Sequence, residues 1–396
     1  MHTDERTPDY PAGTETILTH GGRWPDRQHG FVNTPIYRGS TVVFPALDAL
    51  EDMGLRYRYG RQGTPLTDGL EDLITELEGA AGTVLAPSGV AAISLALMTC
   101  LSSGDEVLIT DSVYEPTRVL ADTLLARMGI TTRYFDPRIG DAIGGMVGPR
   151  TRAVFLESPG SLTFEIQDLP AIHAALAGRG IAILIDNSWA TPLFHRPLAL
   201  GADLVIHSAT KMFSGHSDVM MGTVSANADF IKPLAATHRT LGLTASPDDS
   251  FLVARGMRTL GVRMREHERR TLALAHWLAG RGDVEVLHPA LPSHPDHAVF
   301  ARDFSGSGCL FSFVLPPAPR EAVAAFVDHL EIFGMGYSWG GYESLILPTK
   351  PHRIRTATPW THSGNLFRVH VGFEDFEALK ADLAAGLERY FSSAGD

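Results

Sequence analysis

The sequence is poor in cysteine and in positive charge. Of its 396 residues only two are cysteines, Cys100 and Cys309, and neither has a second cysteine near it. No disulfide framework and no zinc site of paired thiolates is therefore predicted. Asp and Glu outnumber Lys and Arg by 45 to 33, which gives a formal net charge of −12, and the basic residues form no run. This pattern argues against a nucleic acid or an anionic membrane surface as a partner.

Long apolar runs are also missing. None approaches the roughly 20 residues that a membrane-spanning helix needs. The first residues, Met1 to Arg6, lack the basic start and apolar core of a secretory signal. Hydrophobic residues make up 44% and charged residues 20% of the chain, a composition typical of folded proteins. We therefore expect a globular, cytoplasmic enzyme of two to three domains.

Three segments of the chain differ in pattern. Residues 1–62 are rich in Thr, Pro, Gly and Arg, with scattered aromatic residues and little periodicity. Such an arm contains too many apolar residues to remain unpacked in water, so we expect it to pack on its own chain or on a second subunit. Residues 63–255 alternate helical and strand-like stretches, and residues 256–396 begin with a long charged helical stretch, Leu260–Arg281, and continue as a smaller α+β domain.

The middle segment predicts an α/β fold. The apolar positions of Thr67–Glu78 fall on one face of a helix. Short apolar runs follow, most of them separated by helical segments, at Thr83–Ala86, Glu106–Thr110, Thr131–Phe135, Ala153–Leu156, Ile181–Ile185 and Leu204–Ile206. Strands that alternate with helices predict a mainly parallel sheet with helices on both faces. Ligands bind beyond the carboxyl ends of the strands in such sheets.

Two charged residues follow predicted strands at this edge. Asp186 directly follows the predicted strand Ile181–Ile185. A buried carboxylate at this place needs a cation as its partner. The alternative is that Asp186 only caps a following helix. Lys211 follows the strand Leu204–Ile206. Most lysines are solvated surface groups, but Ser208 and Thr210 just before it are of the type that holds a phosphate beside an imine-forming lysine.

A turn between a strand and a helix supplies a third element. In Ser88-Gly89-Val90 the glycine allows close approach, and the free backbone N–H groups at the helix start favour an anion, although the turn alone is also an ordinary helix cap. A phosphate cradle, a carboxylate and a lysine at one sheet edge are the partners that pyridoxal 5′-phosphate (PLP) needs. Tyr114, just past Glu106–Thr110, is placed to stack on the cofactor ring. No Gly-x-Gly-x-x-Gly or Walker pattern occurs, which argues against a nucleotide-binding oxidoreductase.

At this point the chain resembles a known family. The segments that carry the resemblance are Tyr59-Gly60-Arg61, Phe155-Leu156-Glu157-Ser158-Pro159-Gly160, Ile185-Asp186-Asn187, Ser208-Ala209-Thr210-Lys211 and Ser338-Trp339-Gly340-Gly341-Tyr342-Glu343-Ser344-Leu345. They resemble the Cys/Met-metabolism family of fold-type-I PLP enzymes and, within it, are most similar to the cystathionine β-lyases. The resemblance runs from Asn33 to the final helix.

The resemblance implies roles for the residues that bind the cofactor. Lys211 would carry PLP covalently, Asp186 would pair with its ring nitrogen, and Tyr114 would stack on the ring and help proton transfer. The phosphate would be held by Ser88, Gly89, Val90, Ser208 and Thr210. Tyr59 and Arg61 would reach the phosphate in the neighbouring subunit's site, which implies a dimer at least and, by resemblance, a homotetramer.

The resemblance also implies a substrate site. Arg368 would bind the α-carboxylate of an amino acid, a task for which its planar fork suits it better than lysine would. Tyr337, Ser338 and Trp339 would line the substrate pocket. The implied reaction is β-elimination of L-cystathionine to homocysteine, pyruvate and ammonia, as in methionine biosynthesis and transsulfuration.

Other assignments stay open at this stage. Tyr337 favours β-elimination, because γ-acting relatives usually place an acidic residue there. Gln62 and Leu243 depart from the β-lyase pattern, so a γ-elimination, a γ-replacement or another amino-acid substrate is the alternative, unless both changes are neutral. A PLP-binding protein without catalysis is a third reading, although it has no need of both Lys211 and Arg368. A group of histidines in a Pro-rich loop is interpreted as loop residues without a metal: His288, His294 and His297.

Overall fold

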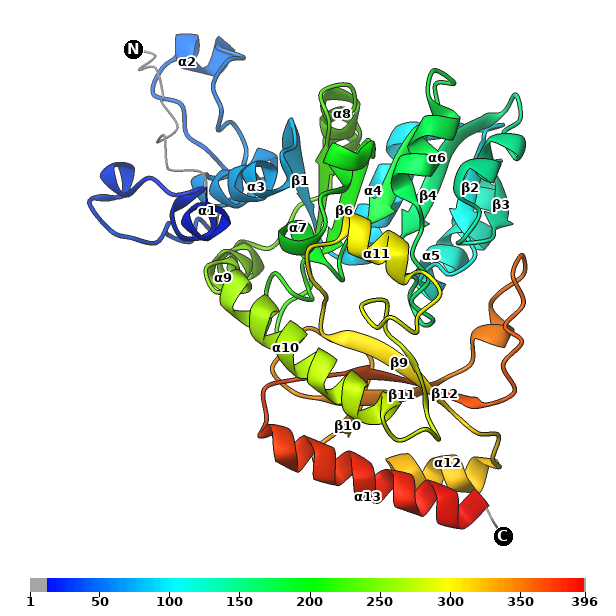
Figure 1. Ribbon diagram of the computed structural model, residues 1–396. Helices are drawn as coiled ribbons and strands as arrows, with labels where there is room; N and C mark the ends of the chain where they lie inside the picture. The colour runs from blue at the N-terminus through cyan, green and yellow to red at the C-terminus, as the bar shows by residue number, and fades with distance from the viewer. Residues whose placement is uncertain (1–12, 395–396) are drawn as a thin grey trace.

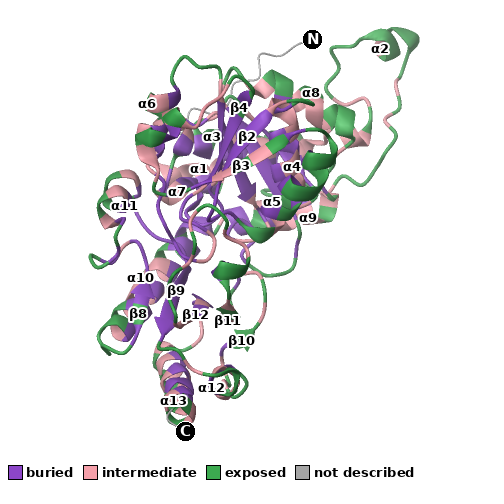
Figure 2. Cartoon of the chain, turned by 90° about the vertical axis from the view of Figure 1, so that its right-hand side faces the viewer, coloured by how far each residue is buried: buried purple, intermediate pink, exposed green. Residues whose placement is uncertain are grey.

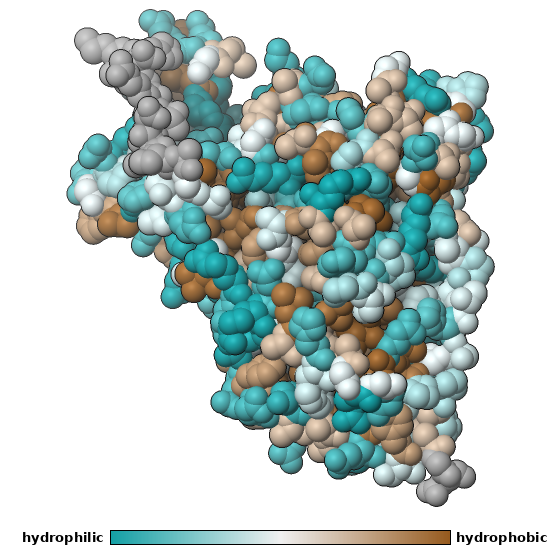
Figure 3. All heavy atoms as spheres, viewed as in Figure 1, coloured by the Kyte–Doolittle hydropathy of each residue, from teal (hydrophilic) through white to brown (hydrophobic). Residues whose placement is uncertain are grey.

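The computed structural model describes residues 13–394, so the expectation that rests on Met1 to Arg6 concerns residues outside that range. The described chain forms two parts, each built around one β-sheet (Figure 1). Among the described helices, none is long and apolar enough to span a membrane. On the face shown in Figure 3, hydrophilic side chains are spread widely and apolar ones lie in the gaps between them.

The first sheet has seven strands in the order β1-β7-β6-β5-β4-β2-β3. The strands are β1 (Gly82–Ala86), β2 (Glu106–Thr110), β3 (Thr131–Phe135), β4 (Thr151–Glu157), β5 (Ala182–Asp186), β6 (Leu204–Ser208) and β7 (Gly222–Ala226). All pairs among β2 to β6 are parallel, whereas β7 pairs antiparallel with β1 and β6. The predicted mainly parallel sheet is confirmed. The strand β7 was not predicted, because its Gly-Thr-Val-Ser-Ala sequence has little apolar character although all five residues are buried.

Helices cover both faces of this sheet. They are α3 (Pro65–Glu78), α4 (Gly89–Cys100), α5 (Glu115–Leu120), α6 (Leu169–Leu176), α7 (Thr191–Phe194) and α8 (Ile231–Leu241). On β4, Ala153 and Phe155 belong to the core cluster that includes α4, while Val154 and Leu156 belong to the one that includes α6. Because successive side chains of a strand point to opposite faces, a strand covered on both sides reads as a continuous apolar run.

The second part contains the smaller sheet, with strand order β10-β11-β12-β9-β8. Its strands are β8 (Glu285–Leu287), β9 (Leu310–Leu315), β10 (Gly334–Met335), β11 (Leu345–Thr349) and β12 (Asn365–His370), and the helices from α9 on are α9 (Pro247–Met257), α10 (Leu260–Ala279), α11 (His297–Asp303), α12 (Arg320–Val327) and α13 (Phe376–Ala394). α12 and α13 lie below this sheet, on the side away from the first sheet (Figure 1). The long charged helix expected at 260–281 is thus confirmed as α10.

The described residues before α3 form an arm with little regular structure. It holds α1 (Thr14–His20) and α2 (Leu47–Glu51), and the part around α2 projects away from both sheets (Figure 1). Figure 2 shows this projecting part as largely exposed. Several apolar side chains of the arm are exposed: Phe31 by 71%, Val43 by 85% and Met53 by 80%. Exposed apolar side chains gathered on one segment are a surface that another chain can cover.

Candidate active site

A cavity of about 600 Å³ lies between the two parts of the chain. The residues predicted as sites that line it are Ser88, Gly89, Val90, Tyr114, Asp186, Ser208, Thr210, Lys211, Tyr337, Ser338, Trp339 and Arg368. The first eight residues of this set, up to Lys211, come from loops, helix starts and strand ends around the first sheet, and the other four come from the second part of the chain. The structure therefore brings together residues that are far apart in the sequence, with those of the first part at the carboxyl ends of β1, β2, β5 and β6, as expected for ligand sites of parallel sheets.

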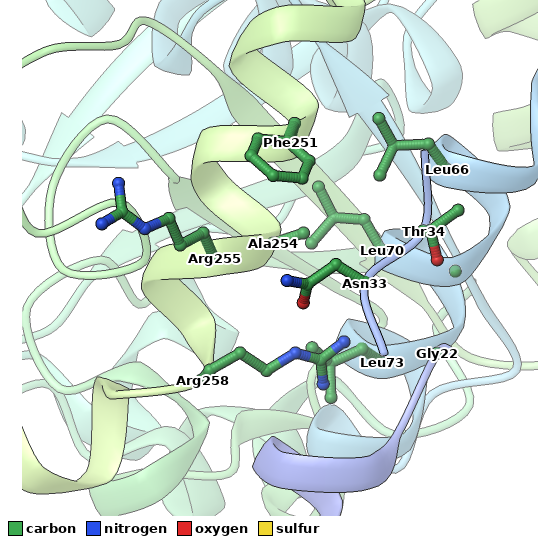
Figure 4. A pocket seen from close by; sticks show the side chains of 11 residues that line it. Gly22, Asn33, Thr34, Leu66, Leu70, Leu73, Phe251, Ala254, Arg255 and Arg258 are labelled. Carbon is green, nitrogen blue, oxygen red and sulfur yellow. The ribbon is translucent and has the colours of Figure 1, made fainter. Parts of the chain in front are cut away.

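A second, much smaller hollow lies beside α9. Figure 4 shows its lining, with Asn33 from the arm, Leu70 and Leu73 from α3, Arg255 from α9 and Arg258 directly after the end of α9. Its volume of about 20 Å³ matches a single water molecule and not an amino acid. None of the predicted site residues lines it.

The side chain of Lys211 reaches into the large cavity. Its Nζ donates a hydrogen bond of 2.5 Å to Oγ of Ser338 and lies 5.7 Å from the ring centroid of Trp339. Burial, and then the nearby charge of Arg368, lower the pKa of Lys211 to about 8. A share of this amine is therefore neutral close to physiological pH, which is the state that acts as a nucleophile or a base.

Two carboxyl groups lie side by side at the strand ends. Glu157 on β4 and Asp186 on β5 are register partners in the parallel pair. Burial raises the pKa of Asp186, and burial and the neighbouring Asp186 raise the pKa of Glu157 well above its usual range. Ionised Asp186 therefore needs a cation in the cavity. The protonated ring nitrogen of PLP is such a cation.

Glu157 was not predicted as a site residue. Its Oε2 accepts a 2.7 Å hydrogen bond from the backbone N–H of Tyr114, so it holds the start of the segment that carries that ring. The sequence signal was available, because Glu157 ends the strand β4 as Asp186 ends β5.

The start of α4 forms an anion cradle. Ser88 caps the helix, since its Oγ accepts a 3.1 Å hydrogen bond from Ala91 N–H. A Cβ on Gly89 would lie 2.8 Å from Oγ of Ser208, so only glycine allows this turn to approach Ser208 so closely. Backbone N–H groups at a helix start and serine hydroxyls are suitable donors for a phosphate. The hydroxyl of Thr210 is partly engaged, because it accepts a 3.0 Å hydrogen bond from Met221 N–H.

The opposite wall of the cavity carries Arg368 on β12. Its Nη2 donates a 3.3 Å hydrogen bond to the carbonyl oxygen of Ser338. Burial lowers the pKa of Arg368, but an arginine stays charged at neutral pH.

Three non-glycine residues that line the cavity have a left-handed backbone conformation. Ser338 has a φ of 74°, and Ser217 and Phe164 have φ of 58° and 60°. Left-handed conformations of non-glycine residues gather at functional sites, where the surroundings enforce them.

Tyr59 and Arg61 do not line the cavity of their own chain. Tyr59 is 46% exposed on the arm, and Arg61 donates a 3.0 Å hydrogen bond to the carbonyl oxygen of Arg239.

The two positions that depart from the β-lyase pattern, Gln62 and Leu243, do not line the large cavity either. Gln62 lies on the arm, where its carbonyl oxygen accepts from Arg56 at 2.8 Å, and Leu243 packs against the core that contains α4.

The three loop histidines were interpreted as residues without a metal, and the structure shows where each of them lies. His288 and His294 are buried, and His297 is the first residue of α11. His288 packs with the edge of Trp189, with ring centroids 6.2 Å apart. Among residues 13–394, no group of three or more His, Cys, Asp or Glu side chains is arranged to hold a metal ion.

Residues 15–388 match the family described as Cys/Met metabolism PLP-dependent enzyme. The chain belongs to this family. It is 46% identical over 380 residues to a putative cystathionine beta-lyase of Rhizobium johnstonii, covering 95% of this chain and 96% of that one. It is 42% identical over 388 residues to a cystathionine beta-lyase of Escherichia coli, covering 95% and 98%. A crystal structure of cystathionine gamma synthase from Xanthomonas oryzae superposes with a TM-score of 0.90 at 34% identity, covering 97% of this chain and 100% of that one.

Membership of the Cys/Met-metabolism family confirms three predictions. The fold is the fold-type-I arrangement, the enzyme is a PLP-dependent carbon–sulfur lyase, and the cofactor is pyridoxal 5′-phosphate. The donor set of the cavity fits this cofactor, with a helix start and Ser208 for a phosphate, a buried carboxyl for a ring nitrogen, and a lysine of lowered pKa.

Proposed function

We propose that this protein is a cystathionine β-lyase of methionine biosynthesis in the cytoplasm. The reaction consumes L-cystathionine and one water and yields homocysteine, pyruvate and ammonia. The observation that carries the proposal is that Ser338 joins two charged side chains. Its hydroxyl accepts a hydrogen bond from the amine of Lys211, and its carbonyl oxygen accepts one from Arg368. This arrangement places a base of suitable pKa beside a carboxylate-binding cation. The relatives described as cystathionine beta-lyases support the choice of substrate.

PLP, when bound, would supply an acceptor for the electrons released at Cα of the substrate. The protein residues prepare that step. The fork of Arg368 binds the α-carboxylate of the substrate, and the neutral amine of Lys211 takes the Cα proton. Ser338 holds Nζ of Lys211 by its hydroxyl, so that the amine is directed before it reacts. The Cβ–S bond then breaks, and the thiol product leaves with a proton.

The remaining residues hold the cofactor. The carboxylate of Asp186 keeps the ring nitrogen protonated, which makes the ring a better acceptor of electrons. Ser88, Gly89, Val90, Ser208 and Thr210 bind the phosphate. Tyr114 stacks on the ring and moves a proton near the leaving group, and burial together with Glu157 raises the pKa of its hydroxyl, which keeps it protonated. Tyr337 and Trp339 border the substrate.

A second copy of the chain completes the site. Tyr59 and Arg61 lie outside the cavity of their own chain, on the arm with exposed apolar side chains. In a homodimer, and in the tetramer that the family resemblance implies, the arm packs on the neighbouring subunit and these two residues bind its phosphate.

The product mixture tests this proposal. Purified holoenzyme is incubated with L-cystathionine, and pyruvate, free thiol and α-ketobutyrate are measured in one reaction. Pyruvate and homocysteine in equal amounts support the proposal. α-Ketobutyrate with cysteine indicates γ-elimination, and neither product from a fully loaded holoenzyme indicates another amino-acid substrate.

A further inference from the structure

The long loop between β11 and β12 crosses from the second part of the chain to the first. We call residues 350–364 the strap. It leaves the second sheet and extends toward the first (Figure 1). Both of its ends are tied to Arg368, because β12 follows it directly and Leu347 on β11 is the register partner of Arg368. A shift of the strap therefore moves the strand that carries this residue.

One anchor of the strap is the buried carboxylate of Asp111. It accepts hydrogen bonds from three consecutive backbone N–H groups of the strap, from Thr356 at 3.1 Å, Ala357 at 2.9 Å and Thr358 at 2.6 Å. The guanidinium of Arg118 also pairs with it. Asp111 is 1% exposed and precedes Tyr114 by three residues. This anchor therefore joins the strap to the segment that carries the tyrosine.

The other anchor is an ion pair between Arg355 of the strap and Glu165. The nitrogen and oxygen are 2.8 Å apart and each side chain is 4% exposed. The preceding residue, Phe164, lines the cavity in a left-handed conformation, and the carbonyl oxygen of Glu165 accepts a 2.8 Å hydrogen bond from Gly160 N–H. This anchor therefore joins the strap to a second wall segment of the cavity.

We propose that the strap is a positioning device, in which Asp111 and Arg355 fix the distance of Arg368 from the walls of the first part and so set the site of the substrate α-carboxylate. Two parts of a chain that meet at a cavity move relative to each other unless charged or apolar contacts hold them. Charge-assisted hydrogen bonds away from water hold a fixed geometry. Asp111 and Arg355 act through Arg368, so the inference rests on the proposed role of that residue.

The test compares holoenzyme variants with L-cystathionine as substrate. Arg355→Met breaks the ion pair, and Arg353→Met is its matched control, because Arg353 is exposed on the same strap. We expect KM to rise about tenfold in Arg355→Met, with kcat and the cofactor absorbance close to wild type, because a small misplacement of a binding group weakens substrate binding. Arg353→Met should leave both constants unchanged.

A double variant keeps the test decisive if the single one does not fold. Glu165→Leu with Arg355→Met removes both charges, so no unpaired carboxylate stays buried, and its KM should rise as in the single variant. A wild-type KM in either folded variant, even with a lowered melting temperature, overturns the proposal. An equal rise of KM in Arg353→Met overturns it as well.

Arg368→Lys separates the two levels of the argument. If it raises KM while the strap variants do not, only the strap inference fails. If it leaves KM unchanged, the proposed role of Arg368 fails and the strap inference fails with it. A rise of KM in Arg368→Lys and in both strap variants, with the control at wild type, is the result that we expect.

Discussion

Nζ of Lys211 and Oγ of Ser338 are 2.5 Å apart, although the two residues come from different parts of the chain. Lys211 follows β6 of the first sheet, and Ser338 lies between β10 and β11 of the second. The contact therefore exists only when both parts are folded and docked. It makes the position of the reactive amine depend on the second part of the chain.

Removal of this hydroxyl should slow catalysis. In Ser338→Ala the amine of Lys211 loses its hydrogen-bond acceptor, and a net hydrogen-bond energy of about 1.5 kcal/mol corresponds to about a tenfold loss of kcat. KM should change less, because the carboxylate site at Arg368 stays intact. Steady-state rates of pyruvate release measure both. Ser392→Ala, on the exposed side of α13, serves as the control, and equal rates for the two variants would contradict the role of Ser338.

The lowered pKa of Lys211 predicts a pH dependence of cofactor uptake. Only the neutral amine forms the covalent bond with PLP. Since the pKa is about 8, the uptake rate of cofactor-free protein should rise as the pH increases through about 8 and level off above it. Stopped-flow absorbance after mixing with PLP measures this rate. A rate that still climbs steeply between pH 9 and 10 indicates an amine of ordinary pKa.

Glu157 predicts a pH dependence of stability. Its pKa in the folded chain lies above that of an unfolded glutamate, so the folded state holds this proton more tightly. The resulting contribution to stability is present below the usual glutamate pKa and is lost as the pH rises through the raised value. The side chain in Glu157→Gln does not titrate, so this variant does not lose stability in this way as the pH rises. The melting temperature of the cofactor-free variant, relative to wild type, should therefore increase from pH 5 to pH 8, and a constant difference argues against the raised pKa.

If Arg61 acts in the active site of the neighbouring subunit, two impaired variants should complement each other in a mixed dimer. Arg61→Ala should retain PLP weakly, and Lys211→Ala should be inactive. In a mixed dimer of the two, one site has both changes and the other has neither if Arg61 acts on the neighbouring site. Co-expressed variants should thus regain activity above that of Arg61→Ala alone. No gain in a preparation shown to contain mixed dimers places Arg61 in its own chain's site.

The strand pattern predicted the central part of the fold well. Glu106–Thr110 and Thr131–Phe135 are strands with the predicted bounds, because buried parallel strands are continuous apolar runs. β7, β8, β10, β11 and β12 were not predicted, since they are short or contain Gly, Ser, Pro and charged residues. α9 was missed as well. The domain boundaries at 62 and 255 stay predictions.

The site was predicted in two ways. Strand ends alone pointed to Asp186 and Lys211, because carboxyl ends of parallel strands share one edge. Arg368 came only through the family resemblance, since its strand β12 pairs in a different sheet and no local pattern links it to Lys211. Glu157 and the strap anchors Asp111 and Glu165 act through contacts between distant segments, which the order of residues in the sequence does not reveal.

Covalent trapping of the cofactor tests the account most directly. The chain contains four lysines, Lys211, Lys232, Lys350 and Lys380, and all of them lie in the described range 13–394, where the large cavity is lined by Lys211 alone among them. Reduction of the holoenzyme with borohydride makes the lysine attachment permanent, and peptide mass spectrometry then locates it. The account predicts the reduced cofactor on the peptide that contains Lys211. Its presence on one of the other three lysines, with Lys211 unmodified, would contradict the account.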